Sequence, residues 1–150
     1  MRVGRNPLRP SHAVHGHSCV GPFYGVRARD VPGELQRFEQ RMHAAVALLD
    51  AVVAVGAAPP TVEVLADVVQ LCTFSHGEWV RIHPFANGNG RTARVWANWV
   101  ALRYGLPAFV QIKPRPEGLA YQAAAMASML DRHGDTELLF HQLLREASDL

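Results

Sequence analysis

The sequence is short of lysine, of cysteine and of long apolar runs. Only Lys113 among its 15 basic residues is a lysine. The two cysteines, Cys19 and Cys72, are far apart, so we expect free thiols in a reducing cytosol. No apolar run is long enough to cross a membrane, and the N-terminus lacks the apolar core of a signal peptide. We therefore expect a cytoplasmic protein without a membrane partner. Secretion as an effector, by a route that needs no such signal, stays open.

Strong charge of either sign is also missing. The formal net charge is +2, so the composition calls for no nucleic-acid partner. With 150 residues, 49% of them hydrophobic, the chain is long enough for one domain with a buried core. Residues 1–20 mix proline, glycine, arginine and histidine without periodicity. We expect a loose N-terminal arm over 1–20 and a single domain over 21–150.

Apolar residues recur at spacings of three and four, which predicts helices. The predicted helices cover residues 34–55, 61–76, 89–104, 117–132 and 135–147, with Thr61 as the N-cap of the second. The third is expected to be largely buried through Val95, Trp96, Trp99, Val100 and Leu102. Residues 22–29 are a candidate for a short extended segment. The predicted fold class is all-α with at most a small hairpin.

The stretch HPFANGNGR, His83–Arg91, breaks this helical pattern. A helix start leaves backbone N–H groups unpaired and carries partial positive charge, and preceding glycines let a ligand approach the backbone closely. Arg91 and Arg94 add two cations where the helix dipole disfavours them. A ligand with several phosphate oxygens would offset that cost. The pattern thus favours a polyphosphate site, while a tight turn with solvent-facing arginines remains the alternative.

A histidine stands just before this break. The ordinary pKa of histidine lies near neutrality, so His83 beside a phosphate site is suited to general-base chemistry. The alternative is a histidine that only makes a structural hydrogen bond. Pro84 and Phe85 are typical of a rigid turn with an apolar anchor, which would fix the direction of the histidine.

Other candidates are weaker. A zinc site in the arm has no matching second cluster of ligands; its residues would be His12, His15, His17 and Cys19. Glu63 and Asp67 are interpreted as a solvated helix face, and Trp96 and Trp99 as packing residues.

The stretch IHPFANGNGRTAR, Ile82–Arg94, closely resembles the signature HPFx(D/E)GNGRxxR of the Fic (Fic/Doc) domain family. His76, seven residues before the motif histidine, and the helix stop Gly105-Leu106-Pro107 agree with it as well. The resemblance implies a Fic-like helical bundle with a central motif helix. It also implies a small β-hairpin flap near 22–29 that pairs with the modified segment of a target protein.

Most proteins with this signature transfer a nucleoside monophosphate, usually AMP from ATP, to a Ser, Thr or Tyr hydroxyl of a target protein. The resemblance therefore implies ATP or another NTP as co-substrate and His83 as the general base. Phe85 would anchor the loop. The backbone of Gly88, Asn89 and Gly90, together with the Asn89 side chain, would cradle the phosphates. Arg91 and Arg94 would hold them, Arg94 the outermost one.

Asn87 departs from the signature, because the family usually has Asp or Glu there to bind Mg²⁺. An amide oxygen can ligate Mg²⁺ but brings no charge. A metal held mainly by the nucleotide, a slow reaction and an unusual substrate all stay open. So does a non-catalytic domain that binds nucleotide or protein, although His83 and both arginines are intact. Phosphoryl transfer, as in the Doc-type toxins of this fold, is disfavoured because those carry a lysine in place of Gly90.

Many Fic proteins are restrained by a helix with an (S/T)xxxE(G/N) motif, whose glutamate pairs with the second motif arginine. We find no such motif here: Ser11 and Ser18 have no glutamate four residues on, and Ser128 is followed by Arg132. The resemblance thus leaves two possibilities. Either the activity is not restrained, or a separate small antitoxin supplies the inhibitory helix.

Overall fold

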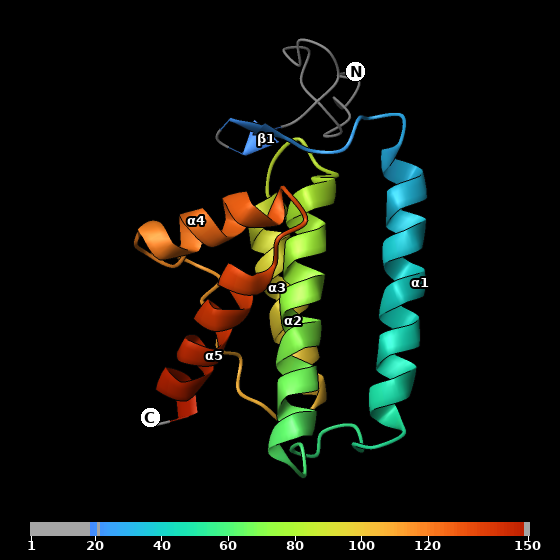
Figure 1. Ribbon diagram of the computed structural model, residues 1–150, viewed down its shortest axis with the longest axis vertical. Coiled ribbons are helices and arrows are strands. Elements are labelled where there is room, and N and C mark those ends of the chain that lie inside the picture. The colour runs from blue at the N-terminus through green and yellow to red at the C-terminus, as the bar shows by residue number, and fades with distance from the viewer. Residues whose placement is uncertain (1–18, 21, 149–150) are drawn as a thin grey trace, which may run out of the picture.

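The computed structural model describes residues 19–20 and 22–148 of the chain. They form two short strands and five helices (Figure 1). The strands are β1 (Cys19–Val20) and β2 (Phe23–Tyr24), and the helices are α1 (Val31–Asp50), α2 (Val62–Ile82), α3 (Asn89–Arg103), α4 (Leu119–Ser128) and α5 (Gly134–Ser148). The prediction of an all-α fold is confirmed. No helix in this part of the chain is long and apolar enough to cross a membrane.

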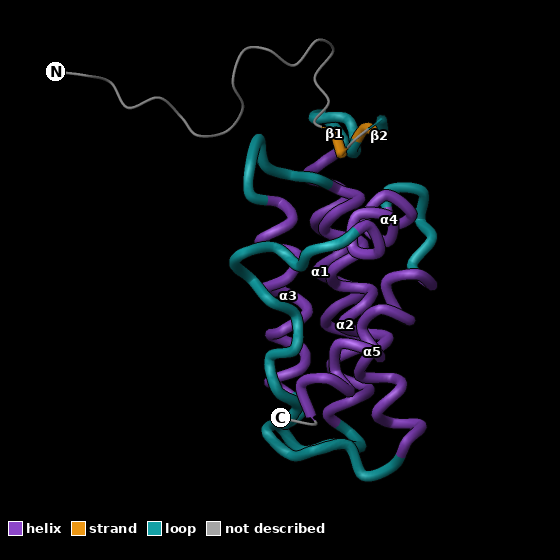
Figure 2. Tube along the Cα trace, turned by 90° about the vertical axis from the view of Figure 1, so that its left-hand side faces the viewer, coloured by secondary structure: helices purple, strands orange, loops and turns teal. Residues whose placement is uncertain are grey.

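Helix α2 lies at the centre of the bundle and contacts each of the other four helices. In Figure 1, α1 lies on one side of it, α4 and α5 lie on the other, and α3 lies behind it. Figure 2, turned by 90°, shows the same elongated bundle with the hairpin at one end. The motif helix α3 was expected at the centre. The structure instead places α2 at the centre, where its residues from 75 to 80 are all buried, and α3 packs against one side of it.

The second helix begins as predicted and ends later. The Thr61 hydroxyl accepts a hydrogen bond from the Val64 N–H (3.3 Å), so Thr61 is the N-cap. The helix was predicted to end near His76 but continues to Ile82. Pro84 explains the true end, because the residue before a proline is kept out of the helical conformation. This extension sets His83 directly at the C-terminus of a rigid central helix.

The remaining helices agree with their predicted positions to within a few residues. Helix α1 starts three residues earlier than predicted, with a proline in its first turn, where the missing N–H costs nothing. It ends at Asp50, yet Val53 beyond it is still buried, which is why the apolar pattern suggested a longer helix. Helix α4 is shorter than predicted at both ends, since it starts only after Gly118 and already ends at Ser128.

The expectation that α3 is largely buried is wrong for one of its faces. Val95, Trp99 and Leu102 are 47%, 42% and 58% exposed, whereas Val100 is fully buried against the bundle. The exposed face borders a groove of about 860 Å³ between α1 and α3. Trp96 lies in this groove with its ring 5.3 Å from that of Phe38. Apolar residues all around α3 therefore indicate an open groove rather than a helix enclosed by others.

The small hairpin is present but lies earlier than predicted. β1 and β2 pair antiparallel, with Cys19 opposite Tyr24 and Val20 opposite Phe23. β1 thus lies in the segment 1–20 that was assigned to the arm. The division into an arm over 1–20 and a domain over 21–150 stays a prediction. The candidate zinc ligands His12, His15 and His17 and the Cys19 side chain lie outside the described structure.

Candidate functional site

His83 is held in a fixed orientation at the end of α2. Its backbone is left-handed (φ 51°, ψ 55°), and its N–H donates to the Trp79 carbonyl at 3.0 Å. Ring atom Nδ1 lies 3.1 Å from the Val80 carbonyl. A carbonyl can only accept, so Nδ1 carries the proton in the neutral ring and Nε2 is the basic nitrogen. Burial lowers the pKa of His83 below its usual value, against a smaller opposite effect of the Val80 bond, so the ring is neutral at pH 7.

The loop between α2 and α3 is closed by a two-bond clamp. The Asn89 side chain accepts from the Phe85 N–H (2.9 Å) and donates to the Phe85 carbonyl (2.7 Å). Asn89 is buried, and the Phe85 ring packs against Trp79 with ring centroids 5.7 Å apart. The clamp and the ring contact fix the path of the backbone from His83 to the start of α3.

Helix α3 starts without a side-chain cap. Gly88 adopts φ 90° and ψ 0°, a left-handed conformation in which a side chain would be strained. The first turn contains no acidic residue. The Gly88 carbonyl accepts hydrogen bonds from the N–H and the hydroxyl of Thr92, at 3.0 and 3.2 Å. The N–H groups of a first turn have no partner within their helix. This helix start is therefore suited to an anion.

Arg94 is a buried cation whose described partners are all neutral. One terminal nitrogen donates to the Tyr121 hydroxyl (3.2 Å) and the other to the Ile112 carbonyl (3.0 Å). Its Nε is buried and has no hydrogen-bond partner in the described part of the chain. No ion pair among the described residues includes Arg94. A buried charge is costly unless it is paired, so this arginine favours an anionic ligand.

These groups border one cleft of about 500 Å³ between the motif and α4. Its lining comprises Val80, His83, Asn87, Gly88, Gly90, Arg91, Arg94, Arg115, Tyr121, Gln122, Ala125 and Met126. Three arginines and no aspartate or glutamate are among them. Two other hollows, of about 710 and 860 Å³, are larger but contain neither His83 nor Arg94. Only the smaller cleft combines a neutral histidine with three arginines among its described lining residues, a combination suited to a polyanion.

Sequence comparison gives the family of the chain. A sequence model described as the Fic/DOC family matches residues 17–101, more than half of the chain. The chain belongs to this family. The match contains α1, α2 and nearly all of α3, and with them every cleft residue that the motif supplies.

Curated relatives match only a short segment. "Protein adenylyltransferase Fic" of Nematostella vectensis is 46% identical over 39 residues, which are 26% of this chain and 9% of that protein. "Protein adenylyltransferase fic-1" of Caenorhabditis elegans is 42% identical over 41 residues, or 27% of this chain and 8% of that protein. The protein of the same name from Caenorhabditis briggsae gives the same figures. The chain thus matches less than a tenth of the length of each relative.

In this Fic/DOC protein, most residues singled out by the motif lie at the cleft. The cleft-lining ones are His83, Asn87, Gly88, Gly90, Arg91 and Arg94. Asn89 was predicted to cradle phosphates with its side chain. The structure gives that side chain another role, because both of its hydrogen-bonding ends are engaged by Phe85. Pro84 and Phe85 also lie outside the lining and shape the loop.

Three charged or polar cleft residues were not found from the sequence, Arg115, Tyr121 and Gln122. All three come from beyond the motif, Arg115 from the segment before α4 and the other two from α4 itself. The run KPRPEG around Arg115 offered a weak signal, since an arginine between two prolines is held on a stiff, extended backbone. Nothing in the sequence marked Tyr121, whose role depends on how α4 packs against α2.

The cleft does not fit a metal ion held by the protein alone. Asn87 is exposed and contributes one amide oxygen, and no carboxylate lines the cleft. Mg²⁺ binds through carboxylates and phosphates and keeps several waters. Phosphate oxygens of a nucleotide would have to supply most of its ligands.

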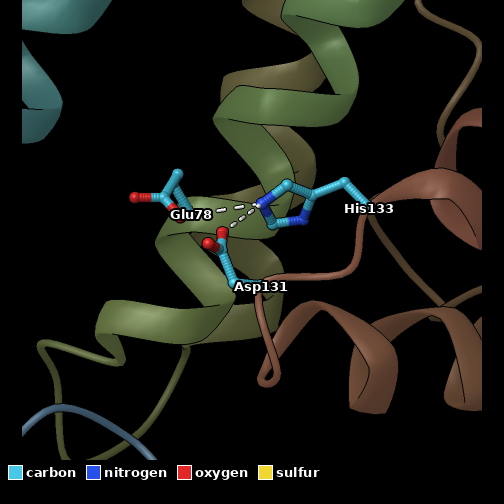
Figure 3. Close-up of side chains that lie close together, drawn as sticks. All are labelled: Glu78, Asp131 and His133. Carbon is cyan, nitrogen blue, oxygen red and sulfur yellow. Dashed lines mark ion pairs between the residues drawn. The ribbon is translucent and has the colours of Figure 1, made fainter.

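A second cluster of ionisable groups, Glu78, Asp131 and His133, shares no residue with the cleft lining (Figure 3). His133 Nε2 is 3.7 Å from Glu78 and 3.3 Å from Asp131. Glu78 is also paired with Arg81 (2.9 Å) and Arg41 (3.6 Å), so its charge is already balanced. Burial alone would raise the pKa of Glu78, but these partners lower it to about 2. The cluster joins α1, α2 and the turn before α5, and we interpret it as a structural ion-pair network.

The remaining sequence interpretations concern single residues. Glu63 and Asp67 are exposed on α2, as expected for a solvated face. Trp96 packs against Trp79 and Trp99 with ring centroids 5.9 and 5.7 Å apart, so it is a packing residue as predicted. Cys72 is buried and has no disulfide partner among the described residues.

Proposed function

We propose that this protein is a nucleotidyltransferase. It moves AMP, or another nucleoside monophosphate, from an NTP to a Ser, Thr or Tyr hydroxyl of a target protein. One observation carries the proposal: a neutral histidine and three arginines border one cleft, and no acidic residue is among the described residues that line it. The names of the curated relatives, all protein adenylyltransferases, point to ATP as the co-substrate.

In the proposed reaction His83 removes the proton from the target hydroxyl. The hydroxyl oxygen then forms a bond to the α-phosphorus, the bond from that phosphorus to the β-phosphate oxygen breaks, and pyrophosphate leaves. The proton taken by Nε2 passes to solvent. Nε2 is suited to this role because Nδ1 is held by the Val80 carbonyl and burial keeps the ring neutral.

The phosphates are assigned to the start of α3 and to the arginines. Backbone N–H groups near Gly88 and Gly90 would bind them closely, since neither residue carries a side chain. Arg91 is exposed at the cleft, whereas Arg94 is buried at its base. Arg94 is therefore the fixed cation and Arg91 the adaptable one. Both would stabilise the negative charge on the leaving pyrophosphate.

The target protein would approach from the end of the bundle that holds the hairpin. Figure 1 shows β1 and β2 at the same end as the loop that joins α2 to α3. An extended target segment that adds to a strand edge is a general recognition mode. In this proposal the hairpin holds the modified segment above His83. A separate antitoxin helix that occupies the phosphate site remains a further expectation.

Labelled ATP tests the proposal. Wild type and His83→Ala are incubated with a cell lysate and with ATP labelled at either the α- or the γ-phosphate. We expect a labelled protein band with the α-label and wild type only. Label from the γ-phosphate would instead mean phosphoryl transfer. The assay is then repeated with the other NTPs, labelled in the same way. The absence of label with ATP and with each of them would contradict transfer altogether.

Asn87 supports one alternative, a Fic domain that binds nucleotide or a partner without catalysis. Its amide brings no charge to help hold a metal. Comparison with Asn87→Asp separates the two functions. Transfer by wild type supports the enzyme, whereas transfer by Asn87→Asp alone identifies the natural protein as a binding domain.

A further inference from the structure

The buried cation of the cleft, Arg94, rests on a chain of neutral groups from two other helices. Its guanidinium donates to the Tyr121 hydroxyl on α4 (3.2 Å), and that hydroxyl lies 2.8 Å from Nε2 of His76 on α2. All three side chains are buried, Arg94 at 7%, Tyr121 at 7% and His76 at 1% exposure. The chain thus runs from the floor of the cleft into the centre of the bundle.

The donors present fix one hydrogen bond of this chain, and the other follows the His76 tautomer. A guanidinium can only donate, so the Tyr121 oxygen accepts from Arg94. We assign the Tyr121 proton to His76 Nε2, which places the ring proton on Nδ1, a buried atom without a hydrogen-bond partner among the described residues. Edge contacts with Tyr121 and Phe140, at centroid distances of 5.7 and 5.3 Å, hold the ring in place. The Tyr121 hydroxyl therefore cannot rotate away without losing a bond.

We propose that Tyr121 and His76 are positioning residues that hold the guanidinium of Arg94 toward the nucleotide phosphates without neutralising it. The inference rests on the proposed function. A carboxylate in place of Tyr121 would orient Arg94 equally well, but it would pair with the cation and compete with phosphate. A hydroxyl backed by a neutral histidine orients the arginine and leaves its charge for the ligand.

The environment of His76 keeps it neutral. Burial lowers its pKa to about 3, and the nearby Arg94 and His133 act in the same direction. At neutral pH the ring therefore offers a lone pair at Nε2 to the Tyr121 proton. A protonated ring would lose that acceptor and add a second cation beside Arg94.

A double-mutant cycle tests the inference, with ATP as the probe and calorimetry as the measurement. Tyr121→Phe keeps the ring but removes the hydroxyl, and we expect the Kd for ATP to rise about tenfold. Arg94→Ala should weaken binding at least as much. In the Arg94→Ala background, Tyr121→Phe should cause no further loss. An equal loss in both backgrounds, or unchanged binding by Tyr121→Phe, would overturn the inference.

His76 gives a second test that does not depend on the tyrosine variant folding. His76→Leu removes the acceptor and should weaken ATP binding about fivefold, while His76→Gln supplies an amide oxygen and should recover most of that loss. Equal affinities of the two variants would overturn the role of His76. Leu49→Ala, at a buried position of α1 that does not line the cleft, is the packing control, which should lower the melting temperature and leave the ATP Kd unchanged.

The outcomes also separate this inference from the proposed function. If Arg94→Ala binds ATP as wild type does, or if wild type does not bind it, the phosphate site itself is wrong and the inference falls with it. If Arg94→Ala loses affinity but the Tyr121 and His76 variants do not, only the positioning role is wrong.

Discussion

Replacing Asn89 by alanine removes the clamp that closes the motif loop. Asn89 is 2% exposed and makes two hydrogen bonds to the backbone of Phe85, at 2.9 and 2.7 Å. A net hydrogen bond contributes about 1 kcal/mol, and a buried group left unpaired costs about 1–3 kcal/mol. Phe85 is 37% exposed, so water can reach much of its freed backbone. With two hydrogen bonds lost at about 1 kcal/mol each, we therefore expect a loss of about 2 kcal/mol.

This loss should appear in two measurements. For a chain of this length, about 2 kcal/mol lowers the melting temperature by roughly 4–8 °C, which circular dichroism detects. The loop should also lose its fixed path, so the affinity for ATP should fall about tenfold even where the helices remain folded, a change of about 1.4 kcal/mol in binding.

A matched variant separates the two effects. Val100 lies on the same helix, is fully buried and does not line the cleft. Val100→Ala should cost about 2 kcal/mol through lost burial and a small cavity. We expect a similar fall in melting temperature with unchanged ATP affinity. If Asn89→Ala binds ATP as tightly as wild type, the clamp does not shape the site and our reasoning is refuted.

Three further predictions concern pH and charge. The rate of transfer should be level around pH 7 and fall only below the ordinary histidine pKa of 6.5, because burial lowers the pKa of His83; a fall already near pH 8 would exclude His83 as the base. Glu78, with a pKa of about 2 against 4.5 for an ordinary glutamate, stabilises the fold above pH 4.5 and loses this effect as the pH falls toward 2. Glu78→Gln should thus lower the free energy of unfolding by about 3 kcal/mol at pH 7 and progressively less in acid, and a pH-independent difference in chemical denaturation would contradict this. Asn87→Asp should increase the dependence of ATP affinity on Mg²⁺ in titrations with and without EDTA, and an unchanged dependence would show that residue 87 does not face the metal.

The motif was predictable because its parts are adjacent in the sequence. His83, the glycines and Arg94 fall within twelve residues, and the helix start that they share follows from local chemistry alone. The end of α2 was not predictable from periodicity. Ser75, His76 and Glu78 interrupt the apolar pattern, yet they are buried in a central helix. Ser75 donates to the Cys72 carbonyl, His76 pairs with the Tyr121 hydroxyl, and Glu78 accepts from Arg81. The last two bonds depend on partner side chains, which the apolar periodicity does not describe.

The far side of the cleft was missed for the same reason. Arg115 and Tyr121 are more than twenty residues from the motif, and only the packing of α4 brings them to Arg94. The exposure of Val95 and Trp99 was also hidden, because apolar residues at a groove look like core residues in a sequence. Periodicity thus located the helices, but not which of their faces another helix covers.

The central claim is that the cleft transfers a nucleoside monophosphate. Mass spectrometry of the modified target, after incubation with wild type and ATP, tests it most directly. We predict that one Ser, Thr or Tyr residue gains the mass of an adenosine monophosphate group, and that His83→Ala leaves this residue unmodified. A gain of a single phosphate group, or an identical modification by His83→Ala, would contradict the account.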